Sequence, residues 1–511
     1  MSDWSSGYVV DVTYTHGFYR ELAPSYLGFA ALVQGFAAPG LGDEPLTYCE
    51  LGCGQGGSTN LLASANPHVE FHANDFNPAH IAGARDLARA ACLSNVHFYD
   101  LSFAEFAENR QLPMFDIIGL HGVYSWISEE NRQHIVRFIR ERLKPGGALY
   151  ISYNAMPGWA PLMPLRHVMT HYAASQSTGP ILARIKDAVA FAERLDSVKA
   201  RYFATNAKAA NHVKNIKSAN VSYLAHEYFN RDLTAFYFAD VAREMSGAKL
   251  TWAGTADLLD TIDAFNLTAE HQELLRGISD ATLRQTIRDH IVDQQFRKDI
   301  YVKGPVPLSK AALQERWLKT RFALTRRGSD VPRKVRTALG EVEMHANIYD
   351  PLIAALDGGP KTLGQLLDDP SVAKHGVAAV RQAIILLTGQ GSCHPCLPGA
   401  GEAERRAHAA ALNETVASRG LDGEGIGYLA SGTTGGGIGA DGVHRLVWLA
   451  RHRKAENVSG FVWDGLRRAD QQLMKEGKPL ATREDALAAI GQLVQSYDLS
   501  LAPVLANLGI A

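Results

Sequence analysis

Residues 48–57, Tyr-Cys-Glu-Leu-Gly-Cys-Gly-Gln-Gly-Gly, decide the fold of this 511-residue chain. An apolar run that begins near Leu46 ends in the acid Glu50, and Ser58-Thr59-Asn60 then opens an apolar pattern of helical period. Between the two stand Gly52, Gly54, Gly56 and Gly57. Glycine allows a sharp backbone turn and lets a ligand approach without a Cβ in the way. The stretch therefore predicts a strand, a tight turn and a helix N-terminus.

The acid before the first glycine indicates the kind of ligand. A dinucleotide fold uses a similar loop to hold a pyrophosphate at a helix N-terminus. A carboxylate at the strand end, such as Glu50, suits instead a ligand with a cationic amine. We interpret the loop as a site for S-adenosylmethionine, although a lone glycine-rich turn can also simply connect a strand to a helix.

Further strands and helices alternate along the next hundred residues. Strands are predicted at 69–75, 96–99, 115–120 and 148–154, and helices at 79–91 and 129–143. The strands end at or near Asp75, Asp100 and His121. Ligands bind at the carboxyl ends of strands in such sheets. We expect Asp75 to bind the ribose hydroxyls and Asp100 to accept a hydrogen bond from the adenine amino group.

Several motifs carry a resemblance to a known family. Glu-x-Gly-x-Gly at 50–54, the Asp75 strand, Asp100 and Lys-Pro-Gly-Gly at 144–147 together resemble a class I S-adenosylmethionine-dependent methyltransferase. Segments 75–78, 121–126, 153–159 and 223–228 resemble bacterial methyltransferases that carry a methyltransferase regulatory domain after the catalytic core. That family includes rickettsial protein-lysine methyltransferases that act on outer-membrane protein.

The resemblance implies a cofactor, S-adenosyl-L-methionine, and a set of residues that bind it. The implied set is Tyr14, Glu50, Gly52, Gly54, Gly56, Asp75, Phe76, Asp100 and His121. Tyr14 belongs to an N-terminal segment that we expect either to fold over the methionine end of the cofactor, as in related enzymes, or only to pack against the sheet.

The expected fold is α/β, with a Rossmann-like methyltransferase core followed by α-rich domains. We predict the core at 1–260 with a helical insert at about 164–225 over the mouth of the site, a helical regulatory segment at 261–304, a winged-helix-like domain at 305–400 and a C-terminal α-rich domain at 401–511. Residues 311–324 read as strand-like. Cys393–Cys396 is expected to be a turn rather than a zinc site, and 429–439 a mobile connector rather than a phosphate loop.

Composition and charge favour a cytoplasmic enzyme. The net charge of −2 gives no basic field for nucleic acid, and no apolar run approaches the ~20 residues of a membrane span. The N-terminus lacks the pattern of a signal peptide, and five cysteines do not make a disulfide framework. The third helix of the winged-helix-like unit offers only Arg381 for DNA, so we expect dimerisation or substrate presentation instead. We predict a homodimer, no nucleic-acid partner and no metal.

The residues after the fourth predicted strand exclude several classes of methyltransferase. Residues 121–126 contain neither the Asn/Asp-Pro-Pro-Tyr/Phe of amino-methylating DNA enzymes nor the Pro-Cys of cytosine C5 enzymes. The acid pair of metal-dependent catechol-type enzymes is also not apparent. Direct displacement at the sulfonium methyl remains, with a nucleophile held in line and little competing water.

Aromatic residues near the predicted site indicate the substrate. Tyr124, Trp126, Tyr153 and Trp159 suit the stem and ammonium of a lysine, although Trp126 and Trp159 also fit ordinary core positions. His121 either orients or deprotonates the nucleophile or hydrogen-bonds the cofactor. We predict a protein-lysine N-methyltransferase with His121, Tyr124, Trp126 and Tyr153 at the catalytic site. The alternatives are methylation of a small molecule or polysaccharide, and a cofactor-binding regulatory protein without turnover.

Overall fold

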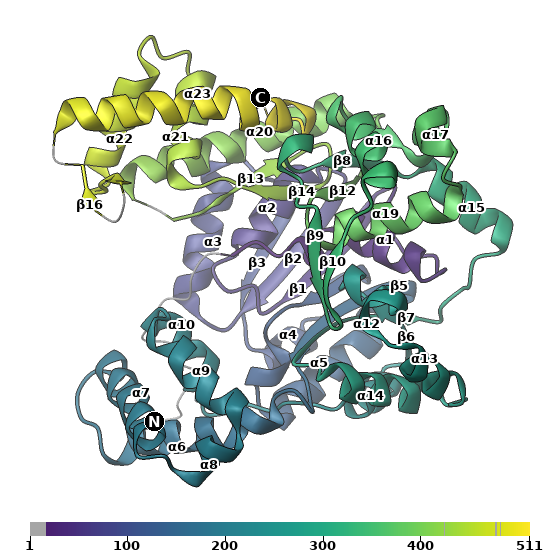
Figure 1. The fold of residues 1–511 in the computed structure, drawn as a ribbon, viewed down its shortest axis with the longest axis vertical. Helices are drawn as coiled ribbons and strands as arrows, with labels where there is room; N and C mark the ends of the chain where they lie inside the picture. Colours follow the sequence, from purple (N-terminus) through teal and green to yellow (C-terminus); the bar gives the residue numbers. More distant parts are fainter. Residues whose placement is uncertain (1–16, 424, 476–477, 481, 511) are drawn as a thin grey trace.

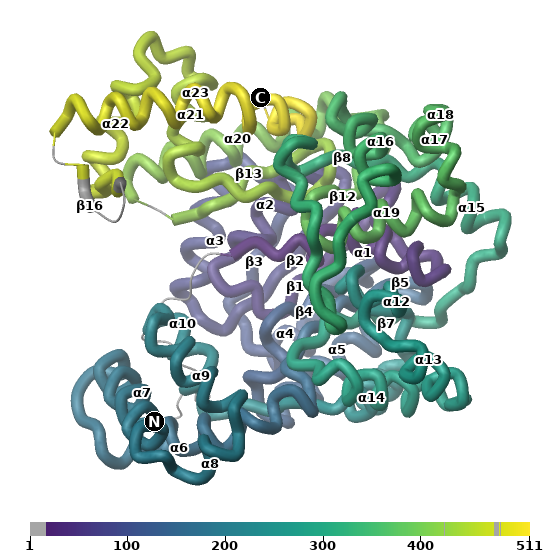
Figure 2. The backbone as a smooth tube through the Cα atoms, viewed as in Figure 1, coloured from purple at the N-terminus to yellow at the C-terminus, as the bar shows by residue number. Residues whose placement is uncertain are grey.

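A computed structural model describes residues 17–423, 425–475, 478–480 and 482–510, and its centre is a seven-stranded sheet (Figures 1 and 2). The strands are β1 (Leu46–Leu51), β2 (Val69–Asp75), β3 (Val96–Asp100), β4 (Phe115–Leu120), β5 (Leu143–Asn154), β6 (Leu250–Thr255) and β7 (Phe296–Lys303), in the order β3-β2-β1-β4-β5-β7-β6. β7 runs antiparallel to β5 and β6, and the other neighbours pair in parallel. The strand order reverses between β1 and β4, where such sheets bind ligands.

Helices cover both faces of the sheet. They are α1 (Pro24–Val33), α2 (Gly57–Ala65), α3 (Pro78–Ala90), α4 (Phe103–Glu108), α5 (Glu129–Arg142) and α11 (Phe238–Gly247). Local sequence sets their starts: Asn77 caps α3 through its bond to the Ala79 N–H, and Ser102 and Glu105 form a capping box on α4. On one face, Phe106, Phe138 and other apolar residues of α4, α5 and α11 form a continuous buried cluster with the sheet.

The predicted helical insertion follows β5 and forms a lobe of its own at the lower left of Figure 1. It consists of α6 (Met163–Ser175), α7 (Ile181–Ser197), α8 (Arg201–Thr205), α9 (Ala207–Lys217) and α10 (Val221–Tyr228). The 3₁₀ helix Ala160–Leu162 leads into it. Its buried residues, among them Leu165, Ile185 and Leu224, make a hydrophobic cluster separate from those of the sheet.

The segment predicted as wholly helical at 261–304 contains a strand of the central sheet. Its helices are α12 (Asp263–Asn266), α13 (Ala269–Arg276) and α14 (Ala281–Val292), preceded by the 3₁₀ turn Leu258–Thr261. Phe296–Lys303 is then β7, inserted between β5 and β6. In β7 the buried apolar run Ile300–Val302 lies between two strands, a setting that favours extended structure over helix. The sheet therefore ends at residue 303 and not near residue 254.

The chain beyond residue 304 mixes helices with short strands. Its helices are α15 (Lys310–Lys319), α16 (Ala346–Asp357), α17 (Leu363–Leu367), α18 (Pro370–Ala373), α19 (Val377–Gly389), α20 (Glu402–Arg419), α21 (Gly442–His452), α22 (Val458–Arg468) and α23 (Arg483–Asn507). Its strands are β8 (Arg321–Leu324), β9 (Lys334–Thr337), β10 (Gly340–Glu343), β11 (Lys361–Thr362), β12 (Cys393–Cys396), β13 (Tyr428–Ser431), β14 (Gly436–Gly439), β15 (Met474–Lys475) and β16 (Lys478–Pro479). The winged-helix interpretation of 305–400 and the exact domain boundaries stay predictions.

Three local predictions in this half are wrong. The strand-like stretch 311–324 is mostly α15, because Ser309 caps a helix that buries Trp317, and only its last four residues form β8. Cys393–Cys396 is a buried strand paired with β8 rather than a turn. The predicted mobile connector 429–439 is the hairpin β13–β14, with most of its residues buried.

The C-terminal half shares a core with the methyltransferase sheet. α20, β13 and β14 pack on α2, and β12 packs on α1. Asn66 donates to the Gly435 carbonyl over 2.8 Å, and Ser25 donates to the Thr434 carbonyl over 2.6 Å. The hairpin β9–β10 crosses the molecule in Figure 1, and the Ala338 N–H donates to Asn266 Oδ1 over 3.2 Å. Within the described residues, no helix is both long and apolar enough to cross a bilayer.

Candidate active site

A cavity of about 700 Å³ lies where the strand order reverses. One part of its wall comes from the turn after β1, the ends of β2 and β4 and the start of β7, with residues 17 and 19, the start of α4 and the 3₁₀ turn Tyr124–Trp126 nearby. The helical insertion contributes another part, through residues that precede α6 and through α9 and α10. The insertion thus lies over the site as predicted.

The glycines of the turn after β1 have different structural roles. Gly52, Gly54 and Gly56 all have positive φ, at 72°, 54° and 67°. A Cβ on Gly56 would lie 2.5 Å from the Ala84 Cβ, so this glycine permits packing against α3 and does not line the cavity. A Cβ on Gly54 would meet nothing within 4 Å, and both Gly52 and Gly54 line the cavity. The backbone at Gly54 is therefore open to a ligand, whereas a Cβ on Gly52 would lie 2.7 Å from Val123 Cγ2.

Asp75 ends β2 and holds the glycine turn in place. Its Oδ2 accepts the Gly54 N–H over 3.0 Å, and its Oδ1 accepts the Asn77 N–H over 2.9 Å. His80 Nδ1 lies 3.2 Å from the same Oδ1. Because a carboxylate offers about four acceptor positions, Asp75 retains capacity for ligand hydroxyls. The side chain lines the cavity beside Phe76.

Glu50 is a buried carboxylate at the end of β1, and it lines the same cavity. The Thr59 hydroxyl, one turn into α2, donates a hydrogen bond to it. Burial raises the pKa of Glu50 to about 7, and the hydrogen bond from Thr59 opposes that shift only in part. A cation beside it would stabilise the ionised form. This is the environment expected for a carboxylate that receives the amine of a ligand.

His121 lies directly after β4 and lines the cavity. Its Nδ1 is 2.8 Å from the Tyr150 hydroxyl, and its ring stacks on Tyr19 with centroids 3.7 Å apart. Burial lowers the pKa of His121 to about 4, so the ring is neutral near pH 7. Gly17 and Tyr19 bring the N-terminal segment to the cavity, whereas Tyr14 lies outside the described residues.

Two of the four aromatic residues predicted to line the site do not face the cavity. Tyr124 is fully buried and donates a hydrogen bond to Glu244, and the Tyr153 hydroxyl donates to Asp299 Oδ2 over 2.6 Å. Both belong to the core beneath α5 and α11, so neither lines the cavity. Trp126 and Trp159 do line it. Asp100, expected near the adenine, is exposed and is not part of the cavity wall.

Several residues that complete the wall were not predicted to belong to the site. Segment 223–228 carries a family resemblance but no predicted role, yet four of its side chains and His212 line the cavity. These four are Tyr223, His226, Glu227 and Tyr228. Lys298 of β7 also lines it and donates to Glu21 Oε1 over 2.7 Å. The resemblance in segment 223–228 was the one available signal for this wall.

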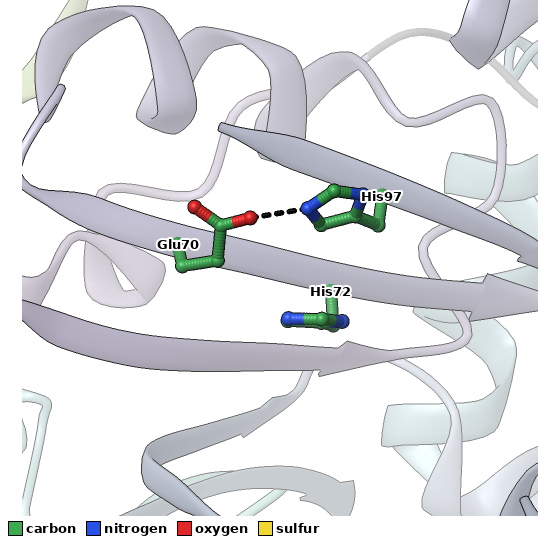
Figure 3. A group of neighbouring side chains, drawn as sticks. All are labelled: Glu70, His72 and His97. Carbon is green, nitrogen blue, oxygen red and sulfur yellow. Dashed lines mark hydrogen bonds and ion pairs between the residues drawn. The ribbon is translucent and has the colours of Figure 1, made fainter. Parts of the chain in front are cut away.

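A second cluster of titratable side chains lies on the sheet away from the cavity. Glu70, His72 and His97 bring ligand-type atoms within 4.8 Å of one another (Figure 3). Glu70 forms an ion pair with His97, and His72 Nδ1 lies 3.0 Å from the Tyr99 hydroxyl. Burial and the nearby His97 lower the pKa of His72 to about 4. These contacts account for the cluster as a cross-strand link between β2 and β3.

Comparison with known proteins agrees with this geometry. Residues 49–149 match the family model of a methyltransferase domain, and residues 220–303 match that of a predicted methyltransferase regulatory domain. The chain is 41% identical to the protein sll1526 of Synechocystis sp., over 99% of this chain and 100% of that one. It is 25% identical to RP789 of Rickettsia prowazekii, over 59% of this chain and 53% of that one.

A solved structure shares the whole fold. PKMT2 from Rickettsia typhi, in complex with AdoHcy, superposes with a TM-score of 0.71 at 17% identity, covering 94% of this chain and 97% of that one. The sheet, the glycine turn and the cavity define a class I S-adenosylmethionine-dependent methyltransferase. The chain belongs to the branch of these enzymes that carries a methyltransferase regulatory domain.

The wall of the cavity fits the cofactor, S-adenosylmethionine. The open backbone at Gly54, the acceptor oxygens of Asp75 and the buried carboxylate of Glu50 match its polar groups. Phe76, Leu101 and Phe103 supply apolar surface beside them. When bound there, the cofactor supplies a sulfonium methyl group, which is the electrophile of the reaction.

Proposed function

We propose that this enzyme is a protein-lysine N-methyltransferase. The observation that carries the proposal is the composition of the cavity wall beyond the cofactor residues. Trp126 and Trp159 line it together with Tyr223 and Tyr228 of the insertion. Aromatic faces of this kind favour an alkyl stem that ends in a cation, as in lysine. The likeness to PKMT2 and the resemblance to rickettsial protein-lysine methyltransferases support the same substrate.

The chain's own residues would bind and orient rather than bond covalently. Glu50, Asp75 and the glycine turn would hold the cofactor, and Trp126 and Trp159 would direct the substrate stem toward it. His121, neutral near pH 7 and held by Tyr150, would keep a fixed polar atom in the cavity wall. Positioning of this kind accounts for much of the rate of a displacement reaction.

A macromolecular substrate and a homodimer remain part of the proposal. Supporting this are the lobe α6–α10 beside the cavity and the large appended half beyond residue 304, both suited to protein contacts. We expect a dimer interface of roughly 1,600 Å² or more in total. Light scattering should report twice the chain mass at micromolar concentration, and a monomer would contradict the dimer alone.

The test of the proposal separates substrate classes. Purified enzyme, radiolabelled S-adenosylmethionine and a bacterial extract are incubated, and the label is followed into protein, polysaccharide and small-molecule fractions. We expect the label in protein, and in methyl-lysine after acid hydrolysis. Label only in polysaccharide or small molecules would favour the second candidate. Cofactor binding without transfer in any fraction would favour a regulatory protein.

A further inference from the structure

Glu227 of α10 is the one carboxylate that the insertion contributes to the cavity wall, within the described residues. The adjacent Tyr228 side chain lies near Trp159, with ring centroids 6.0 Å apart, and Tyr228 holds His212 through a 2.7 Å contact between its hydroxyl and Nε2. The Glu227 side chain therefore lines the same cavity as a set of aromatic side chains that contact one another.

Among the residues that the structure describes, Glu227 has no counterion in the cavity wall. In residues 17–423 and the other described parts, no hydrogen bond or ion pair joins its carboxylate to another side chain. Lys298, the cationic side chain in the same wall, is already paired with Glu21 at 2.7 Å. Glu50 and Asp75 lie at the cofactor loop, where the amine and ribose of the cofactor account for them. Glu227 is the remaining acid.

Such a carboxylate is costly to bury without a cation. Burial alone raises the pKa of Glu227 to about 7, and no neighbouring cation opposes the shift. A positively charged ligand would stabilise its ionised form, and aromatic faces beside it would add cation–π attraction. A lysine ammonium has both the charge and the length of stem for such a site.

We propose that Glu227 is the anion that recognises the cationic amine of the substrate, in a cage completed by Trp159 and Tyr228. This inference rests on the proposed lysine specificity and adds the residue that enforces it. A carboxylate there also favours the reaction. The bound ammonium first loses a proton to water, which frees the lone pair of the neutral amine. The amine nitrogen then gains positive charge as that lone pair forms the bond to the methyl carbon, while sulfur keeps the electrons of the breaking bond and leaves as the thioether of S-adenosylhomocysteine. A fixed anion beside that nitrogen stabilises the developing charge.

Binding of a minimal probe tests the inference without methyl transfer. n-Butylammonium reproduces the end of a lysine side chain, and n-butanol is its uncharged counterpart of similar size. Both are titrated by NMR into enzyme saturated with S-adenosylhomocysteine. The titrations are done at pH 8, where the amine of the butylammonium probe is protonated. We expect the wild type to prefer the ammonium by roughly tenfold or more, as an attraction of about 1.4 kcal/mol would give.

Two variants of Glu227 and one control variant show whether this carboxylate causes the preference for the ammonium. Glu227→Gln should reduce the preference to within about twofold, whereas Glu227→Asp should keep part of it. Glu130→Gln, at an exposed site on α5, should keep all of it. S-adenosylhomocysteine affinity should stay within about twofold in every variant, which also shows that each is folded.

Two results would overturn the inference. One is an unchanged preference for the ammonium in folded Glu227→Gln. The other is a loss of cofactor affinity in that variant with the probe unaffected, which would assign Glu227 to the cofactor. Failure of lysine methylation is a separate result: a Glu227-dependent preference for the ammonium would still stand, and only the lysine assignment would fall.

Discussion

The backbone N–H of Gly54 donates to Asp75 Oδ2 over 3.0 Å, so the acid at the end of β2 fixes the glycine turn after β1. The same side chain both holds the shape of the loop and lines the cavity. The two residues are 21 positions apart in sequence and come together because β1 and β2 are parallel neighbours.

Asp75→Ala should weaken cofactor binding by about 2 kcal/mol or more, because it removes the ribose acceptor and the anchor of the turn. Calorimetry with S-adenosylmethionine measures the loss. Asp86→Ala, an exposed acid on α3, is the matched control and should bind normally. Normal affinity in a folded Asp75→Ala protein would remove Asp75 from the site.

Glu50→Gln should stabilise the unliganded protein and weaken cofactor binding. The folded pKa of Glu50, about 7, exceeds the ordinary glutamate value of 4.5, so the folded state holds the proton more tightly. Stability is therefore lost as pH rises from about 4.5 through about 7. At pH 8 the substitution should raise the free energy of unfolding on the order of 2 kcal/mol.

The same carboxyl gives cofactor binding a pH dependence. Protonated Glu50 must lose its proton to receive an amine, so wild-type affinity should fall as pH drops from 8 to 6. Glu50→Gln should flatten that part of the profile in calorimetry at several pH values. The groups that face Glu50 are Thr59 and Asp75, and titration of His80 beside Asp75 is controlled with His80→Gln. A wild-type profile identical to that of Glu50→Gln would assign the dependence elsewhere.

Trp126→Ala should lower turnover on protein substrate by roughly tenfold or more, since a wall of the substrate path is lost. Cofactor affinity should stay nearly intact, because the cofactor half of the cavity does not depend on it. Tyr124→Phe is the informative comparison. It removes a hydrogen bond to Glu244 outside the cavity, so it should change stability more than turnover. Equal turnover in Trp126→Ala and wild type would exclude Trp126 from the substrate path.

Asn66→Ala should destabilise the whole molecule by about 1–3 kcal/mol. Its buried amide joins α2 to the Gly435 carbonyl of the C-terminal half, so its loss leaves a buried acceptor unpaired. Urea denaturation should show one transition at lower denaturant concentration. Asn211→Ala, exposed on α9, should leave the midpoint unchanged. Two separate transitions would show that the two halves fold independently.

The positions of four predicted cofactor residues on the cavity wall could be read from the sequence because their signals are local. Glu50 and Asp75 lie at the ends of β1 and β2, Gly52 and Gly54 lie in the turn after β1, and parallel pairing brings the strand ends together. The helical insertion was also predictable from its pattern. β7 was not, because a strand added between β5 and β6 is specified by contacts with residues over a hundred positions away.

The aromatic residues expected to meet the substrate were predicted less well, because local sequence patterns do not determine which way a side chain points. Tyr124 and Trp126 are two residues apart in one 3₁₀ turn, yet one enters the core and the other the cavity. Tyr153 likewise points to Asp299 because β5 alternates its faces. Glu227 reaches the cavity through the docking of α10, and the resemblance in segment 223–228 marked this helix without indicating which of its side chains face the cavity.

Mass spectrometry of proteins modified in vitro tests the central claim most directly. Purified enzyme is incubated with isotopically labelled S-adenosylmethionine and a bacterial protein extract, beside Asp75→Ala as a control with weakened cofactor binding. We predict labelled methyl groups on lysine side-chain nitrogens, and far fewer of them in the control when the cofactor concentration is low. Labelled methyl groups found only on hydroxyls, carboxylates or a small metabolite, with none on lysine, would contradict the lysine assignment and leave the methyltransferase assignment standing.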